Sequence, residues 1–137
     1  GNTHFVDHTL VRGTLIKGFE FYNVLNDPFA KAAYIMFMIS EIHPFLDGNG
    51  RIARVMMNAE LVMAGQTRIM IPTVYREDYL GALRRLSRQS DPAVYIRMLQ
   101  RAQRFCSTLK ANPLDIMQIQ LEKSNAFKEH EEARLIF

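Results

Sequence analysis

The sequence lacks several features that mark special classes of protein. Its single cysteine, Cys106, excludes an internal disulfide and has no paired spacing for a zinc site. Seven glycines and five prolines are too few for a disordered or collagen-like chain. The longest apolar run, residues 32–39, falls far short of the roughly 20 residues that span a bilayer. These absences predict a globular protein without a membrane segment, in a reducing, cytoplasmic setting.

Strong charge of one sign is also missing. The formal net charge is +3 and the pI is near 9.2, which permits contact with phosphates or an acidic partner. The basic residues are scattered rather than grouped in a block, so we expect no nucleic-acid partner. The length fits a single domain over residues 1–137. Because the chain begins with Gly1 rather than methionine, we expect it to be a fragment of a longer parent.

Apolar periodicity and start signals predict an all-α fold, a bundle of five or six helices. Asp27 with Pro28, and Asp91 with Pro92, are typical helix starts, an N-cap followed by proline at the first helical position. The predicted helices cover residues 14–25, 29–42, 50–64, 76–86, 91–110 and 114–124.

The N-terminal part of the chain has two less regular segments. For residues 14–25, a hairpin turning at Lys17 and Gly18 is an alternative to the helix. Residues 3–12 are partly β-branched and loosely alternating, which predicts a small β-hairpin or an extended flap.

The polar residues of the chain are most concentrated in residues 43–54, between two strongly apolar helices. Glycines there let the backbone adopt φ > 0, and free N–H groups at the start of the next helix can bind phosphate oxygens. Guanidinium groups match phosphate geometry, one carboxylate with phosphate oxygens and water can hold Mg²⁺, and an imidazole can accept a proton. The residues concerned are His43, Asp47, Gly48, Asn49, Gly50, Arg51 and Arg54.

Each of these residues also has a purely structural interpretation. A histidine before proline can simply end a helix, a Gly-Asn-Gly sequence can form a turn, and two arginines can lie on a solvated helix face. Their joint occurrence within residues 43–54, flanked by almost uninterrupted core, favours a phosphate-handling site.

Residues 43–54 read His-Pro-Phe-Leu-Asp-Gly-Asn-Gly-Arg-Ile-Ala-Arg. This segment resembles the motif of the Fic family, His-Pro-Phe-x-(Asp/Glu)-Gly-Asn-Gly-Arg-x-x-Arg, at every specified position, and the likeness extends over residues 3–110. The resemblance implies a Fic-like helical bundle and Mg²⁺-dependent transfer of AMP from ATP to a Ser, Thr or Tyr hydroxyl of a target protein.

The resemblance also implies roles for individual residues. His43 would be the general base and Asp47 the Mg²⁺ ligand, and Phe45 would anchor the loop in the core. Phosphates would be bound by Gly48, Asn49, Gly50, Arg51 and Arg54.

Outside the loop, the resemblance makes residues 3–12 a target-binding flap that aligns the target as an added strand. Tyr75 and Tyr79 would contact the adenine, although core packing explains them equally well.

Members of this family are commonly inhibited by a helix with the motif (Ser/Thr)-x-x-x-Glu-(Gly/Asn), whose glutamate would pair with Arg54. Residues 124–128 have Lys128 where that glutamate is required. We therefore expect an inhibitory helix elsewhere or an antitoxin-like partner. Three alternatives to AMP transfer stay open, namely a regulatory module that binds nucleotide or phosphate without catalysis, removal of AMP, and transfer of another phosphate-containing group.

Overall fold

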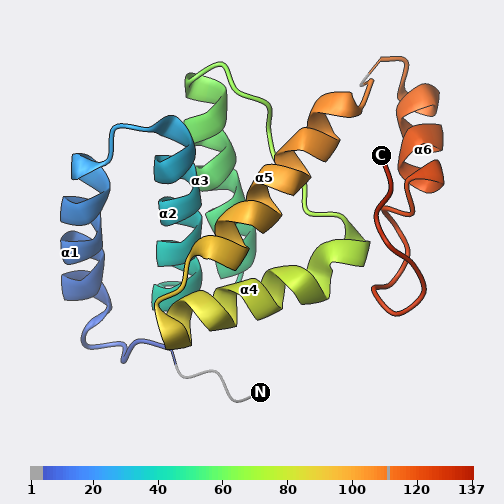
Figure 1. Cartoon of the computed structure of the whole chain (residues 1–137). Coiled ribbons are helices and arrows are strands. Elements are labelled where there is room, and N and C mark those ends of the chain that lie inside the picture. The colour runs from blue at the N-terminus through green and yellow to red at the C-terminus, as the bar shows by residue number, and fades with distance from the viewer. Residues whose placement is uncertain (1–4, 111) are drawn as a thin grey trace. The chain divides into compact units, whose positions relative to one another are not determined.

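The computed structural model describes residues 5–110 and 112–137, and over these residues it is helical without a strand (Figure 1). The predicted all-α bundle of five or six helices is confirmed. The chain divides into two compact units between Gln66 and Thr67, and each is described separately. The elements are α1 (Val11–Val24), α2 (Pro28–Ile42), α3 (Asn49–Met63), the 3₁₀ turn η1 (Thr73–Tyr75), α4 (Arg76–Gln89), α5 (Ala93–Thr108) and α6 (Leu114–Lys123).

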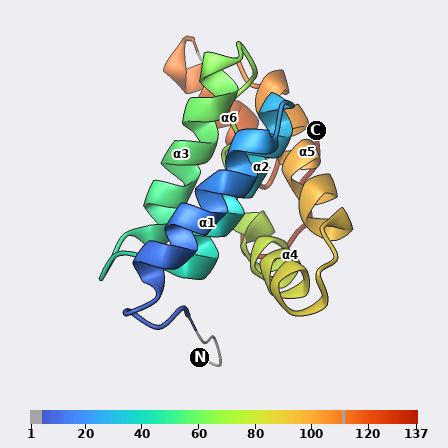
Figure 2. The same ribbon diagram turned by 90° about the vertical axis from the view of Figure 1, so that its left-hand side faces the viewer.

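Helix α2 is the centre of the first unit, where it packs against both α1 and α3 (Figures 1 and 2). The predicted start signal is confirmed, because the Asp27 carboxylate accepts a hydrogen bond from the Ala30 N–H at 2.7 Å and Pro28 is the first helical residue. Apolar residues cover nearly every face of the helix, and its residues are either buried or partly buried. Its buried residues are Ala32, Ala33, Ile35, Met36, Met38, Ile39 and Ile42.

Helix α1 confirms the helical interpretation of this segment, and the hairpin alternative is wrong. Gly18 is the one buried residue of α1. A Cβ added there would lie only 2.3 Å from the Met38 sulfur of α2, so the two helices approach closely at this point. The Tyr34 hydroxyl donates to the Gly18 carbonyl at 3.1 Å, which ties α2 to the same point. Near the end of α1, the Tyr22 hydroxyl donates to the Glu60 carboxylate of α3. Glycine is therefore the residue that lets α1 approach α2.

The N-terminal flap does not have the expected β-structure in its described part. Residues 8–10 form a turn, and α1 begins at Val11 rather than at residue 14. The turn is stabilised by Asp7, whose carboxylate accepts from the Thr9 N–H at 2.9 Å. Over residues 5–12 the predicted hairpin is therefore wrong, and residues 3 and 4 lie outside the described residues.

The second unit contains η1, α4, α5, α6 and the C-terminal segment. Helices α4 and α5 pack together, and α5 contributes the fully buried side chains Tyr95, Leu99 and Phe105. The Asp91 carboxylate accepts from the Ala93 N–H at 3.0 Å. The second Asp-Pro signal precedes a helix as predicted, but Pro92 is the N-cap of α5 rather than its first helical residue. In the described part of the chain, no helix has the length and apolarity to cross a membrane.

Candidate active site

His43 is the C-cap of α2, in left-handed backbone geometry with φ 54° and ψ 54°. Its N–H donates to the Ile39 carbonyl at 3.1 Å, while Pro44 prevents the next turn of helix from forming. The imidazole Nδ1 lies 3.4 Å from the Ser40 carbonyl oxygen. The helix thus ends at the predicted residue and presents the imidazole at its C-terminus.

A phenylalanine that the sequence did not single out for the site covers the imidazole. The rings of Phe5 and His43 are stacked, with their centroids 3.7 Å apart and their planes at 20°. The two residues are far apart in sequence, and no local pattern indicates such a contact. One face of the imidazole is consequently closed to a ligand.

Asn49 braces the loop that follows His43. Its side-chain oxygen accepts from the Phe45 N–H at 2.9 Å, and its side-chain NH₂ donates to the Phe45 carbonyl at 2.7 Å. The residue is 2% exposed. The side-chain amide of Asn49 therefore holds the loop backbone. Its backbone N–H lies in the first turn of α3 and can donate to an anion.

Phe45 and Gly50 differ from their predicted geometry. The expectation that Phe45 anchors the loop in the core is wrong, because its side chain is 49% exposed and Asn49 holds only its backbone. Gly48 has the expected positive φ, 79°, as the N-cap of α3. The same expectation for Gly50 is wrong, because α3 begins at Asn49 and Gly50 is helical. A Cβ at position 50 would lie 3.4 Å from the end of the flexible Arg54 side chain, which is close to ordinary van der Waals contact.

The charged residues of the motif lie at the start of α3. Arg51 donates to the Asp47 carboxylate at 3.2 Å, and both side chains are largely exposed, so solvent screens the pair. Arg54 is partly buried, one turn further along the helix. Two guanidinium groups and the positive end of α3 thus adjoin the Gly48 turn, an arrangement that favours bound phosphate.

The donors available for a metal fit Mg²⁺ delivered with a nucleotide. Among the described residues there is no group of three or more His, Cys, Asp or Glu side chains able to hold a metal. Asp47 offers one exposed carboxylate beside the phosphate-binding turn. Mg²⁺ commonly takes one or two carboxylates and completes its shell with phosphate oxygens and water. Asp47 would then exchange its contact with Arg51 for the ion.

Tyr75 and Tyr79 belong to the second unit and are 8% and 7% exposed. The Tyr75 hydroxyl accepts a hydrogen bond from Arg101, and burial raises the pKa of Tyr75. Both side chains are buried, as the core interpretation expects. Their contact with adenine stays a prediction.

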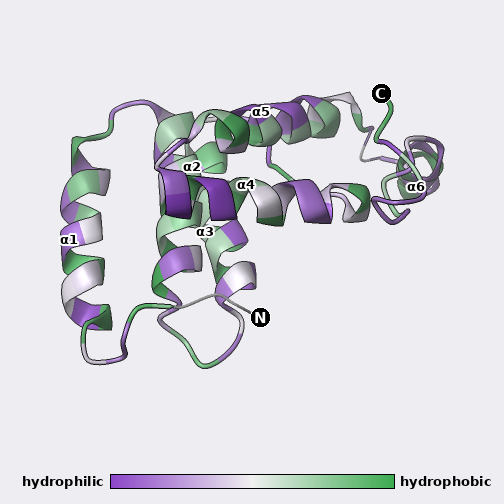
Figure 3. Cartoon of the chain, turned by 60° about the horizontal axis from the view of Figure 1, so that its bottom comes forward, coloured by the Kyte–Doolittle hydropathy of each residue, from purple (hydrophilic) through white to green (hydrophobic). Residues whose placement is uncertain are grey.

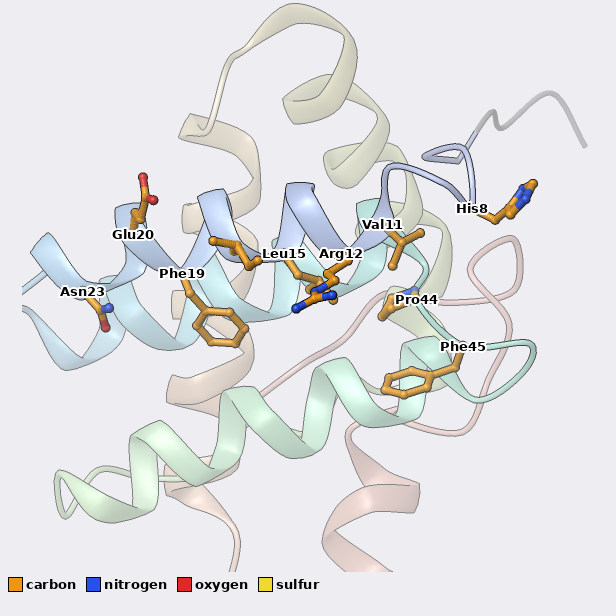
Figure 4. A pocket seen from close by; sticks show the side chains of 10 residues that line it. His8, Val11, Arg12, Leu15, Phe19, Glu20, Asn23, Pro44 and Phe45 are labelled. Carbon is orange, nitrogen blue, oxygen red and sulfur yellow. The ribbon is translucent and has the colours of Figure 1, made fainter.

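A groove of about 810 Å³ runs beside the loop, between α1 and the residues that follow His43 (Figure 4). Leu15 and Phe19 of α1 lie on one side, and Pro44 and Phe45 lie on the other. Arg12 also projects into this region. Sequence reasoning missed the groove, because its walls come from distant segments whose contact has no local signature.

Over the described residues the protein is all-α, with a glycine turn at the N-terminus of α3 and a histidine at the end of α2. Residues 5–61 match the model of the Fic/DOC family, so this part of the chain is similar to that family. Two similar curated proteins are named protein adenylyltransferase Fic. The one from Drosophila persimilis is 38% identical over 72 residues, and the one from Drosophila grimshawi is 36% identical over 72 residues.

Those matches cover 53% of this chain and 14% to 15% of the relatives, so the chain spans about a seventh of their length. A solved structure of a Fic domain containing signaling protein from Bacteroides thetaiotaomicron aligns with a TM-score of 0.59. It is 20% identical, and the alignment covers 90% of this chain and 50% of that one. The structural likeness supports the Fic-like fold.

Proposed function

We propose that this protein transfers AMP from ATP to a Ser, Thr or Tyr hydroxyl of a target protein. The observation that carries the proposal is the joint placement of His43 at the end of α2 and of the Gly48 turn at the start of α3, with Asn49 bracing the loop between them. Relatives named protein adenylyltransferase support this class of reaction. The target, the metal and the residue roles below are part of the proposal.

His43 acts as the general base. It accepts the proton of the target hydroxyl, whose oxygen then bonds to the α-phosphorus of ATP. The bond from that phosphorus to the β-phosphate oxygen breaks, and pyrophosphate leaves with the electron pair. A positioned general base typically contributes 10²–10⁴-fold to such a step.

The start of α3 binds the triphosphate. Backbone N–H groups of Gly48, Asn49 and Gly50 face its oxygens, and Arg51 and Arg54 neutralise successive phosphates. Mg²⁺, held by Asp47 together with phosphate oxygens, would supply further charge neutralisation.

Control of the site is proposed to act through Arg54. An inhibitory helix or an antitoxin-like protein would supply a glutamate to its guanidinium and so compete with a phosphate for the same donors. The setting of the reaction is proposed to be cytoplasmic and reducing, in keeping with Cys106 as a free, buried thiol.

The test incubates the protein with labelled ATP, Mg²⁺ and a cell lysate. We expect His43→Ala to lower the rate of label transfer by about 100-fold or more, because the proton acceptor is lost. His130→Gln, a histidine change in the second unit, is the matched control and should keep the wild-type rate. Equal transfer by wild type and His43→Ala would refute the role of His43.

Mass spectrometry of the modified proteins separates the remaining alternatives. An added mass of AMP on a hydroxyl residue is the expected result. A different added mass would show transfer of another phosphate-containing group, and loss of AMP from a modified protein would show the reverse reaction. Calorimetric binding of ATP with Mg²⁺ without any transfer would favour a regulatory module.

A further inference from the structure

The imidazole of His43 is restrained on two sides. Its Nδ1 edge faces the Ser40 carbonyl oxygen at 3.4 Å, and one of its faces is stacked on Phe5 with centroids 3.7 Å apart. Phe5 is 47% exposed, so hydrophobic burial of its ring is incomplete. The specific consequence of this contact is the orientation of the imidazole.

The Ser40 carbonyl selects one tautomer of His43. A carbonyl oxygen can only accept, so the neutral imidazole that makes this contact carries its proton on Nδ1. The lone pair is then on Nε2, the nitrogen that can take a proton from a hydroxyl. A contact of 3.4 Å is long for a hydrogen bond, so it leaves freedom for the ring to turn.

We propose that Phe5 is a positioning residue for His43, which stops the imidazole from turning and keeps Nε2 directed at the acceptor hydroxyl. This inference rests on the proposed function. In the transfer step the hydroxyl proton passes to Nε2, the hydroxyl oxygen bonds to the α-phosphorus, and pyrophosphate leaves. Phe5 touches none of these atoms and acts only through the ring of His43.

The first test is spectroscopic and does not depend on activity. Protons of a ring stacked on an aromatic face are shifted upfield, so the His43 ring protons should show such a shift in the NMR spectrum, and His43→Gln assigns the signals. Phe5→Leu, which keeps apolar bulk without an aromatic ring, should abolish the shift. Phe5→Tyr should keep it. Unchanged His43 signals in Phe5→Leu would overturn the proposal.

The second test is kinetic. With ATP varied, Phe5→Leu and Phe5→Ala should lower kcat about 10- to 100-fold, because small misplacement of a catalytic group is costly. The KM for ATP should change less than about threefold, since the phosphate-binding turn is untouched. Phe5→Tyr should recover kcat to within about threefold of wild type.

Two outcomes of the kinetic test count against Phe5. An unchanged kcat in Phe5→Leu would overturn the proposal, and so would a raised KM at constant kcat. Failure of the proposed function has a different signature, because the wild-type chain would then transfer no AMP while the NMR comparison still reports the Phe5 contact.

Discussion

Helices α1 and α2 have similar lengths, but α2 is the more apolar and the two are held in the first unit by different means. Helix α2 buries seven residues, whereas α1 buries only Gly18. Hydrophobic and hydrophilic turns alternate along α1 in Figure 3, and Phe21 and Val24 are 55% and 72% exposed. The position of α2 follows from extensive apolar burial, and that of α1 from a few specific contacts.

This difference matters for the site, because the two helices serve it differently. Helix α2 carries His43 at its end, so the proposed base lies on the element of the unit with the most buried residues. Helix α1 forms one wall of the groove beside the loop. Perturbing α2 should therefore unfold the unit, whereas perturbing α1 should change local geometry.

The largest expected effect tests burial in α2. Met36 is 0% exposed, and Met36→Ala should lower the free energy of unfolding by about 2–5 kcal/mol through lost transfer energy and a cavity. Phe21→Ala in α1 removes a larger but exposed side chain and should cost less than about 1 kcal/mol. Urea unfolding followed by circular dichroism measures both. Similar decreases in the free energy of unfolding for the two variants would show that α1 depends on side-chain burial as much as α2 does.

The next effect tests the close approach at Gly18. Gly18→Ala should lower the free energy of unfolding by about 1–3 kcal/mol, because the new methyl group overlaps the buried Met38 side chain. Gly13 lies in the same helix with nothing within 4 Å of an added Cβ. Gly13→Ala should instead stabilise by about 0.5–1 kcal/mol through helix propensity. Equal stability of the two variants, measured by urea unfolding, would show that α1 does not need this contact.

The smallest effect tests the polar tie between α1 and α3. The hydrogen bond to the Glu60 carboxylate raises the pKa of Tyr22 to about 12 from its usual value of 10.0. Tyr22→Phe should cost about 0.5–1.5 kcal/mol at neutral pH, a range reduced because the pair is only partly buried.

The pH dependence of that contribution follows from the raised pKa. The contact is fully present below about pH 10 and is lost as the pH rises through about 12, where the folded phenol ionises. The stability difference between wild type and Tyr22→Phe should shrink over that range in thermal unfolding scans. A difference independent of pH would mean that Tyr22 acts by packing alone.

The sequence was a good guide wherever the determining signal is local. Asp27 with Pro28 places the start of α2, and Pro44 ends it at the predicted residue. Apolar patterns together with proline signals predicted the six α-helices found in the described residues. The residues of the 43–54 motif do lie together at the facing ends of α2 and α3. Local rules cover these cases because capping and chain stiffness act over a few residues.

Contacts between distant residues were not predictable in the same way. The stacking of Phe5 on His43 and the hydrogen bond from Tyr22 to Glu60 depend on how the helices pack, and neither has a periodic signature. Gly50 shows a subtler failure. Its glycine was attributed to a positive φ, but the residue lies inside α3 and its φ is not positive.

The left-handed backbone of His43 has a consequence for any effort to stabilise this protein. At such a helix end glycine is the least strained residue, and a side chain there costs on the order of 1 kcal/mol or more. A redesign for stability that replaces left-handed residues with glycine would therefore include His43, and would remove the residue to which we assign the proton transfer. At position 43, protein stability favours glycine, whereas the proposed activity requires histidine.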